Sequence, residues 1–198
     1  MTYVITQGRA IGIPDLFAVY TTLGTPGNSN LPSVPTEAQL GEIVTAYDVA
    51  SNAAATGAGG YGEFILLAVP TSTSVTAGLY YSFTPSDYKI AALPTSAGTT
   101  TTSGIPIALA VNSVTSNASS VQYTWFQVGG RGTALKTAVA AAPNVPVYLS
   151  GTAGRVQFTG SAFKGFVGVR TANATTVASG TSTVAVYMNG RPCITVAI

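Results

Sequence analysis

The side chains that usually carry acid–base and metal chemistry are scarce in this sequence. The chain of 198 residues has no histidine and one cysteine, Cys193. Without histidine it lacks the commonest general base and metal ligand, and every Ser-His-Asp arrangement is excluded. One cysteine can form neither an intrachain disulfide nor a structural zinc site. The sequence therefore predicts no cofactor and no metal, and leaves the carboxylates as candidates for chemistry.

The carboxylates are few and all lie in the first 87 residues. They are Asp15, Glu37, Glu42, Asp48, Glu63 and Asp87. A pair drawn from the last five could act as acid and base in glycoside hydrolysis. A sugar-cleaving cleft usually places aromatic side chains beside its acids, but the only tryptophan, Trp125, is distant in the sequence. Because most roles of an active site remain unfilled, we expect no catalytic residue and no enzymatic activity.

A glycine-rich segment at residues 57–62, GAGGYG, matches the G-x-G-x-x-G pattern of dinucleotide-binding sites. That motif needs a strand before it and a helix after it. Here the motif begins inside a linker of small residues at 51–60, so linker residues and not a strand precede it, and an apolar run, EFILLAV, follows it. This context argues against a dinucleotide site.

From residue 61 onward, short β-branched and aromatic runs alternate with clusters of Gly, Pro, Ser and Asn. Their spacing predicts strands at residues 63–69, 79–83, 88–92, 105–111, 122–128, 134–137, 145–149, 155–158, 166–170 and 183–188. No stretch keeps a long helical period, although residues 134–142 could form a short helix. We expect an all-β fold, a β-sandwich or barrel.

The N-terminal part of the sequence is irregular. Residues 1–36 are punctuated by Gly and Pro, and residues 23–35 show no periodicity. Such long irregular segments are uncommon inside compact domains. The sequence therefore predicts an extended N-terminal arm and linker over residues 1–60 and a β-domain over residues 61–198. The arm would become ordered against a neighbour, and disorder of the arm in the free protein is the alternative, compatible with the first. Within the arm, residues 36–40 could open a helix, and residues 42–48 could equally be a strand.

The stretch at residues 121–149 is the expected centre of the fold. Trp125 and Phe126 are adjacent on a predicted strand and must face opposite sides. We expect one to fill the core and the other to cover an edge or an interface. The sequence GGRG at residues 129–132 predicts a turn that allows positive φ. Arg131 would project from this turn and could meet an acid of another subunit, with a solvated arginine as the alternative.

Charge is low and unevenly distributed. Charged residues make up 7% of the chain, against roughly 25% in soluble domains. Residues 1–87 hold six acids and one base, whereas residues 88–198 hold seven bases and no acid. This separation could attract a second copy of the chain. The bases are scattered, so we expect no nucleic acid partner, and the longest apolar run, residues 64–69, is too short to span a membrane.

Five short blocks resemble, in the same order, blocks of the decoration (cement) proteins of tailed-bacteriophage heads. They are LGEIVTAYD at residues 40–48, YGEFI at 61–65, WFQV at 125–128, NVPVYL at 144–149 and TAG at 152–154. The resemblance covers roughly residues 40–154 and implies an all-β fold, capsid decoration and trimers. The linker at residues 53–60 and the acid-free C-terminal half depart from the pattern.

The resemblance implies a structural virion protein, made in the host cytoplasm, that binds the major capsid protein on the outer surface of the head and stabilises it. A tail, fibre or host-adhesion β-module is the alternative, and a host-surface glycan could be a further ligand. We further expect a homo-oligomer, a trimer, and predict that five residues make the contacts between its subunits. They are Arg131, Trp125, Glu42, Asp48 and Glu63.

Overall fold

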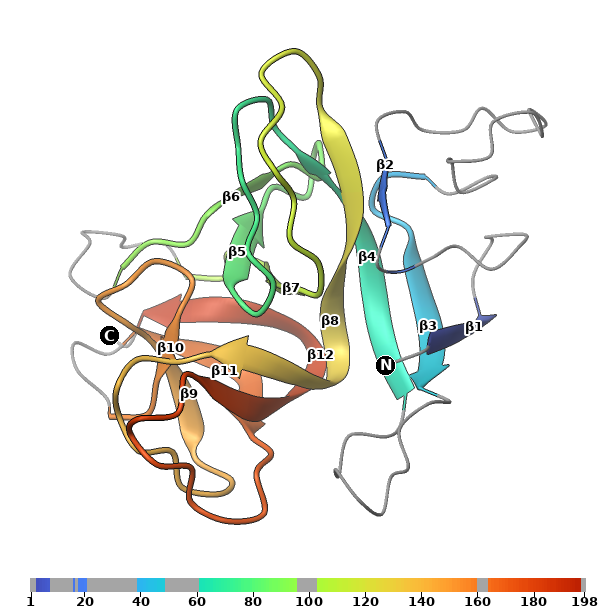
Figure 1. Ribbon diagram of the computed structural model, residues 1–198. Coiled ribbons are helices and arrows are strands. Elements are labelled where there is room, and N and C mark those ends of the chain that lie inside the picture. The colour runs from blue at the N-terminus through green and yellow to red at the C-terminus, as the bar shows by residue number, and fades with distance from the viewer. Residues whose placement is uncertain are drawn as a thin grey trace.

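The described part of the chain is built of antiparallel strands. A computed structural model describes residues 3–7, 16, 18–20, 39–48, 61–95, 103–159 and 164–196. These residues contain no helix, and their sheet curls into a half-barrel, which confirms the expected all-β class (Figure 1). The strands are β1 (Tyr3–Gln7), β2 (Val19–Tyr20), β3 (Ile43–Asp48), β4 (Tyr61–Val69), β5 (Tyr80–Phe83), β6 (Ile90–Ala92), β7 (Ile107–Ala110), β8 (Gln122–Leu135), β9 (Pro146–Leu149), β10 (Val156–Gln157), β11 (Lys164–Thr171) and β12 (Thr183–Val196).

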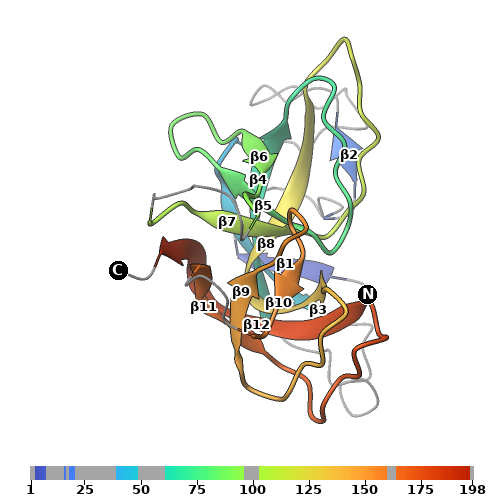
Figure 2. The same cartoon turned by 90° about the vertical axis from the view of Figure 1, so that its left-hand side faces the viewer.

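The strands form one continuous sheet with a branch. The main path runs β1-β3-β4-β8-β12-β11-β9-β10, and all its pairings are antiparallel. β7 branches from β8 and leads through β5 to β6, while β2 pairs with the start of β8. Figures 1 and 2 show the result as two groups of strands, with β5–β7 on one side and β9–β12 on the other.

Three hydrophobic clusters fill the spaces between the strands. The N-terminal core contains Leu16, Tyr20, Val44, Ala46, Phe64, Leu66 and Trp125. The central core contains Ile65, Leu67, Val69, Val75, Tyr81, Ile90, Ala108, Ala110, Val114, Phe126 and Val128. The C-terminal core contains Tyr80, Leu93, Ile107, Leu109, Ala134, Ala141, Val147, Leu149, Val156, Phe166, Val169, Val184, Val186, Met188 and Ile194.

Side-chain alternation explains why these cores are separate. Successive residues of a strand point to opposite faces. On β4, Leu66 therefore enters the N-terminal core while Leu67 enters the central core. On β5, Tyr81 enters the central core while Tyr80 enters the C-terminal core. Strands buried on both faces read as continuous apolar runs, as residues 64–69 do.

Three described strands fall within residues 1–60, for which the sequence predicts an extended arm. β3 pairs with β4, β1 pairs with the far side of β3, and β2 pairs with β8. These strands belong to the sheet, so the boundary expected at residue 60 does not separate them from it. The strand alternative for residues 42–48 is confirmed. The rest of the predicted arm, including most of the helix expected at residues 36–40, lies outside the described residues.

The turn predicted at residues 129–132 is wrong, because β8 continues through it as one strand of 14 residues. Its first part pairs with β4 and its second part, from Gly130, pairs with β12. The ladder slips by one residue between Glu63 and Phe64, which marks a β-bulge, and Gly130 has the expected positive φ, 82°. Bulges and glycines bend a strand where it changes partners. The glycines therefore bend the strand without ending it.

The short helix considered for residues 134–142 is also wrong. Residues 134 and 135 end β8, and the next residues form isolated bridges, Lys136 with Val156 and Ala141 with Val177. β-branched residues within this stretch weaken a helix, and pairing with neighbouring segments prevails here. In the same way β12 continues to Val196, eight residues past the end of the strand predicted at residues 183–188.

The buried hydroxyl of Tyr80 gives a stability prediction. The side chain is fully buried, packs edge-on against Phe166 with ring centroids 4.9 Å apart, and its hydroxyl has no hydrogen-bond partner among the described residues. An unsatisfied buried polar group is destabilising. Tyr80→Phe should therefore raise the free energy of unfolding by about 1 kcal/mol in urea titrations.

The same substitution should change the response to alkali. Burial raises the pKa of the Tyr80 hydroxyl far above its usual value of 10.0. Above pH 10 the unfolded chain loses this proton and the folded protein keeps it, so stability falls by about 1.4 kcal/mol per pH unit. Tyr80→Phe should remove this fall. Tyr81→Phe is the matched control: its hydroxyl accepts a hydrogen bond from the Thr76 amide at 3.0 Å, so its loss should destabilise. Equal effects of the two variants would contradict the prediction.

Candidate functional site

The described residues hold no recognisable catalytic constellation. They contain no group of three or more His, Cys, Asp or Glu side chains placed to hold a metal ion. The ion pair that they do contain, Lys89 with Asp87 at 3.3 Å, is exposed. The Lys89 amide donates to the Asp87 carboxylate and holds its pKa below the usual value. In the same ranges, no helix is long and apolar enough to cross a lipid bilayer.

The two central aromatic residues are both core residues. Trp125 enters the N-terminal core and Phe126 the central core, so the prediction that they face opposite sides is confirmed. Both have 0% of their surface exposed. The expectation that one of them covers an edge or an interface is therefore wrong, and the subunit contact predicted for Trp125 is corrected to a place inside its own chain.

Arg131 lies within β8 and does not project from a turn. It is opposite Tyr187 of β12, which is opposite Arg170 of β11, so the three form a row across the sheet. The Arg131 guanidinium donates to the Ala172 carbonyl oxygen at 2.9 Å. The Arg170 guanidinium donates to the side-chain and main-chain oxygens of Asn144, both at 2.7 Å. These acceptors are neutral, so the positive charges of the row are not compensated by them.

The three acids predicted to make contacts lie on another part of the sheet. Glu63 is half-buried on β4, where its carboxylate packs over Gly129. Glu42 precedes β3 and accepts a hydrogen bond from the Gln39 amide at 3.1 Å. Asp48 ends β3, and its side chain lies outside the described residues. No described acid pairs with Arg131, so a contact with an acid of another copy stays a prediction.

Lys136 is a buried lysine that the sequence gives no reason to single out. Its exposed fraction is 1%, and burial lowers the pKa of its ammonium group. Lowered pKa values are typical of reactive lysines. Here the ammonium donates to three carbonyl oxygens, of Thr137 at 3.3 Å, Val139 at 2.8 Å and Ser179 at 3.2 Å. These bonds use all three N–H groups, and they make Lys136 a structural clamp between two loops.

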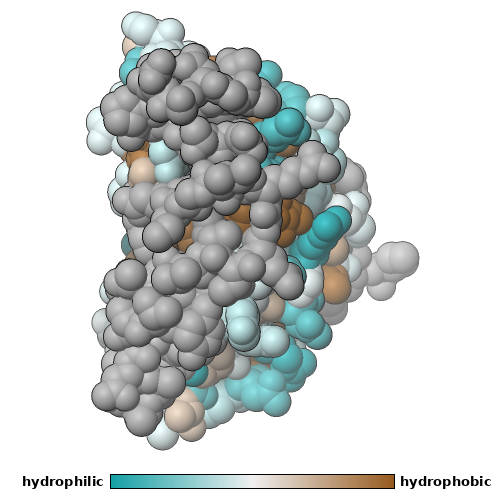
Figure 3. Space-filling model, turned by 90° about the vertical axis from the view of Figure 1, so that its right-hand side faces the viewer, coloured by the Kyte–Doolittle hydropathy of each residue, from teal (hydrophilic) through white to brown (hydrophobic). Residues whose placement is uncertain are grey.

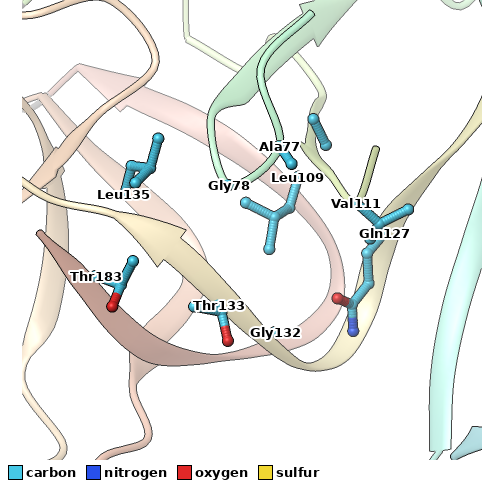
Figure 4. A pocket seen from close by; sticks show the side chains of 10 residues that line it. Ala77, Gly78, Leu109, Val111, Gln127, Gly132, Thr133, Leu135 and Thr183 are labelled. Atoms are coloured by element: carbon cyan, nitrogen blue, oxygen red, sulfur yellow. The ribbon is translucent and has the colours of Figure 1, made fainter. Parts of the chain in front are cut away.

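A shallow apolar groove of about 230 Å³ lies where the two groups of strands meet on one side of β8 (Figure 4). Its walls are made by the turn before β5, by β7 and by the second half of β8. The lining residues are Ala77, Gly78, Leu109, Ala110, Val111, Gln127, Gly132, Thr133, Leu135 and Thr183. The Gln127 amide donates to the carbonyl oxygens of Gly129 and Arg131, which fixes the β8 bend at the groove edge. The groove carries no charged side chain.

A second hollow of about 270 Å³, which we call the crease pocket, lies where the second half of β12 meets β3, β4, β5, β7 and β8. Buried Ile65, Ile107 and Val128 contribute apolar surface, and exposed Arg191 is its one charged residue. The full lining is Gly41, Ile43, Ile65, Phe83, Pro85, Tyr88, Pro106, Ile107, Val128, Arg191 and Pro192. A hollow that combines apolar walls with a single charged group is typical of binding sites. Six separate segments of the chain build it, so sequence reasoning could not find it.

The outer face on the side of β3 and β4 has a different character. Figure 3 shows hydrophobic side chains near the middle of this face and hydrophilic ones along one margin. Exposed Tyr61 begins β4, with 64% of its surface accessible.

Comparison with protein-family models, with characterised proteins and with solved structures found no match.

Proposed function

We propose that this chain is a structural virion protein that decorates the outer surface of a tailed-phage head and stabilises it through contacts with the major capsid protein. The proposal rests on the resemblance of the five sequence blocks. One structural observation supports it: three of those blocks fall on β3, β4 and β8, which are hydrogen-bonded neighbours. Because these three blocks pair with one another in the sheet, the resemblance covers one connected part of the fold and not three unrelated strands.

The surface and the chemistry are consistent with this role. Charged residues are 7% of the chain, so much of the surface can be buried against partners without leaving charges unpaired. The described residues offer no metal-binding cluster, and their buried lysine is held by carbonyl oxygens. A non-catalytic structural role fits these features. A homo-oligomer, a trimer, remains part of the proposal, as do location on the capsid surface and a host-surface glycan as a further ligand.

The test is an add-back experiment on particles that lack this protein. Purified protein should bind them to saturation in hundreds of copies over the head, and should raise the temperature at which DNA becomes accessible to dye. Stripped particles that resist heat and osmotic shock as well as intact ones would contradict the stabilising role. A few copies confined to the tail would favour the alternative, a tail, fibre or host-adhesion module.

A further inference from the structure

We propose that the crease pocket is the docking site for residues 31–37 of a second copy of this chain, LPSVPTE. The inference concerns the contact between copies, and it does not rest on the proposed location on a phage head. It is carried by three features: the chemistry of the pocket, an arginine without a partner among the described residues, and the complementary chemistry of one segment of the sequence.

Main-chain hydrogen bonds and close packing hold Tyr88, one of the apolar residues of the pocket wall, in place. Tyr88 adopts a positive φ of 52°, which is rare for a bulky residue. Two main-chain hydrogen bonds hold it there, from its own amide to Thr84 at 2.8 Å and from the Ala68 amide to its carbonyl at 2.9 Å. Its ring lies directly on Gly41, where any Cβ would collide with the ring. Strained conformations maintained in this way are typical of binding sites, and they leave little ordering entropy to lose on binding.

The walls have the composition that recognises proline-containing peptides. Phe83 and Tyr88 supply two aromatic rings, and Pro85, Pro106 and Pro192 supply further flat apolar surface. Grooves lined by aromatic side chains bind extended segments with prolines spaced three residues apart, because such segments are already stiff. The volume, about 270 Å³, is sufficient for a few small side chains and not for a helix.

Arg191 gives the pocket a positive charge. The side chain is exposed and lines the pocket, and no described residue forms a hydrogen bond or ion pair with it. No carboxylate lines the pocket. A guanidinium in this setting binds a carboxylate readily, because it offers two parallel N–H donors. The occupant should therefore carry a carboxylate beside its apolar part.

Residues 31–37 meet both requirements. Pro32 and Pro35 have the spacing of three, and Glu37 follows. In an extended proline-type helix, Glu37 would lie about 6 Å beyond Pro35, within reach of a flexible arginine. The sequence has the same proline spacing at residues 143 and 146, but these residues form a turn and the start of β9, and no acid is near them in the sequence. Residues 31–37 are therefore the matching segment.

The distribution of charge favours docking between copies. All acids lie in residues 1–87, and all bases except Arg9 lie in residues 89–191, so segment and pocket attract each other. A contact of one segment with a different surface on the next copy is heterologous, and such contacts close into rings when the rotation permits. The proposed trimer would be such a closed ring.

The test uses charge reversal in the full-length protein. We expect Arg191→Glu and Glu37→Arg each to weaken self-association at least tenfold, measured by analytical ultracentrifugation at low salt. The variant carrying both substitutions should regain it. Arg170→Glu, an exposed arginine on β11 outside the pocket, is the matched control and should have a much smaller effect. Trp125 fluorescence, unchanged in every variant, will show that the fold is intact.

Mixing separates docking between copies from docking within one chain. An equimolar mixture of the two single variants restores complementary pairs only if the segment of one chain enters the pocket of another. Recovery in the mixture supports the proposal. Recovery in the double variant without recovery in the mixture would overturn it in favour of the chain's own segment. A monomeric wild type, or variants that associate like the wild type, would also overturn it, whatever the outcome of the add-back experiment on particles.

Discussion

Gly130→Ala is expected to be among the most damaging single substitutions in this protein. A Cβ at this position would collide with the Tyr61 carbonyl oxygen in the neighbouring strand, and that oxygen belongs to the main chain and cannot move away cheaply. The φ of 82° adds about 1–2 kcal/mol for any residue with a side chain. Together the two effects should reduce the free energy of unfolding by about 3 kcal/mol, a large share of the stability of an ordinary domain.

Gly104→Ala separates the two causes. Gly104 has the same φ, 82°, but a Cβ there would meet nothing within 4 Å. Its substitution should show only the conformational term, about 1–2 kcal/mol. Urea denaturation of both variants, followed by circular dichroism, gives the difference directly. If Gly130→Ala were no worse than Gly104→Ala, the close approach of β4 and β8 at the bend would not be a constraint on this fold.

Trp125→Ala is the second large effect. The side chain is completely buried in the N-terminal core, next to Phe64 and Leu66 of β4. Removing so large a side chain sacrifices its transfer energy and leaves a cavity, which together should destabilise by about 3–5 kcal/mol. The measurement is the urea midpoint from circular dichroism, because the variant loses the only tryptophan as a fluorescent reporter.

Two further variants provide comparisons for the loss of stability in Trp125→Ala. The Trp125 indole N–H has no acceptor among the described residues, so Trp125→Phe removes an unsatisfied donor as well as volume. Trp125→Phe should therefore lower the free energy of unfolding clearly less than Trp125→Ala does. Tyr187→Ala, at a position with 51% of the side chain exposed, should change stability by less than about 0.5 kcal/mol. A large effect at Tyr187 together with a small one at Trp125 would contradict the assignment of the core.

The sequence predicts strands well where local alternation and burial agree. Residues 63–69 are apolar on both faces and form β4, and the pairs Trp125–Phe126 and Tyr80–Tyr81 each divide between two cores. It fails at residues 129–132, because local preference cannot distinguish a glycine-rich turn from a glycine-rich bend. That difference depends on whether β12 arrives to pair with Gly130 and the residues after it.

The candidate site could be predicted only in fragments. The proline spacing and the charge separation are visible in the sequence, but Arg191 and Tyr88 are 103 positions apart and meet only after β12 has crossed to the other group of strands. Lys136 gives no sequence signal either, because its partners are main-chain carbonyl oxygens, which every residue type supplies. Sites built from main-chain atoms and distant segments are not visible to local reasoning.

β8 also determines how cooperatively the molecule should unfold. It pairs with β4 in one half and with β12 in the other, and it contributes residues to all three cores. Neither half can therefore lose its structure and leave the other a complete sheet. We expect both halves to melt in one cooperative transition, with amide protons of β4 and β12 exchanging with solvent at the same, globally limited rate. On the phage head proposed above, a molecule of this kind under internal pressure would fail as a whole or not at all.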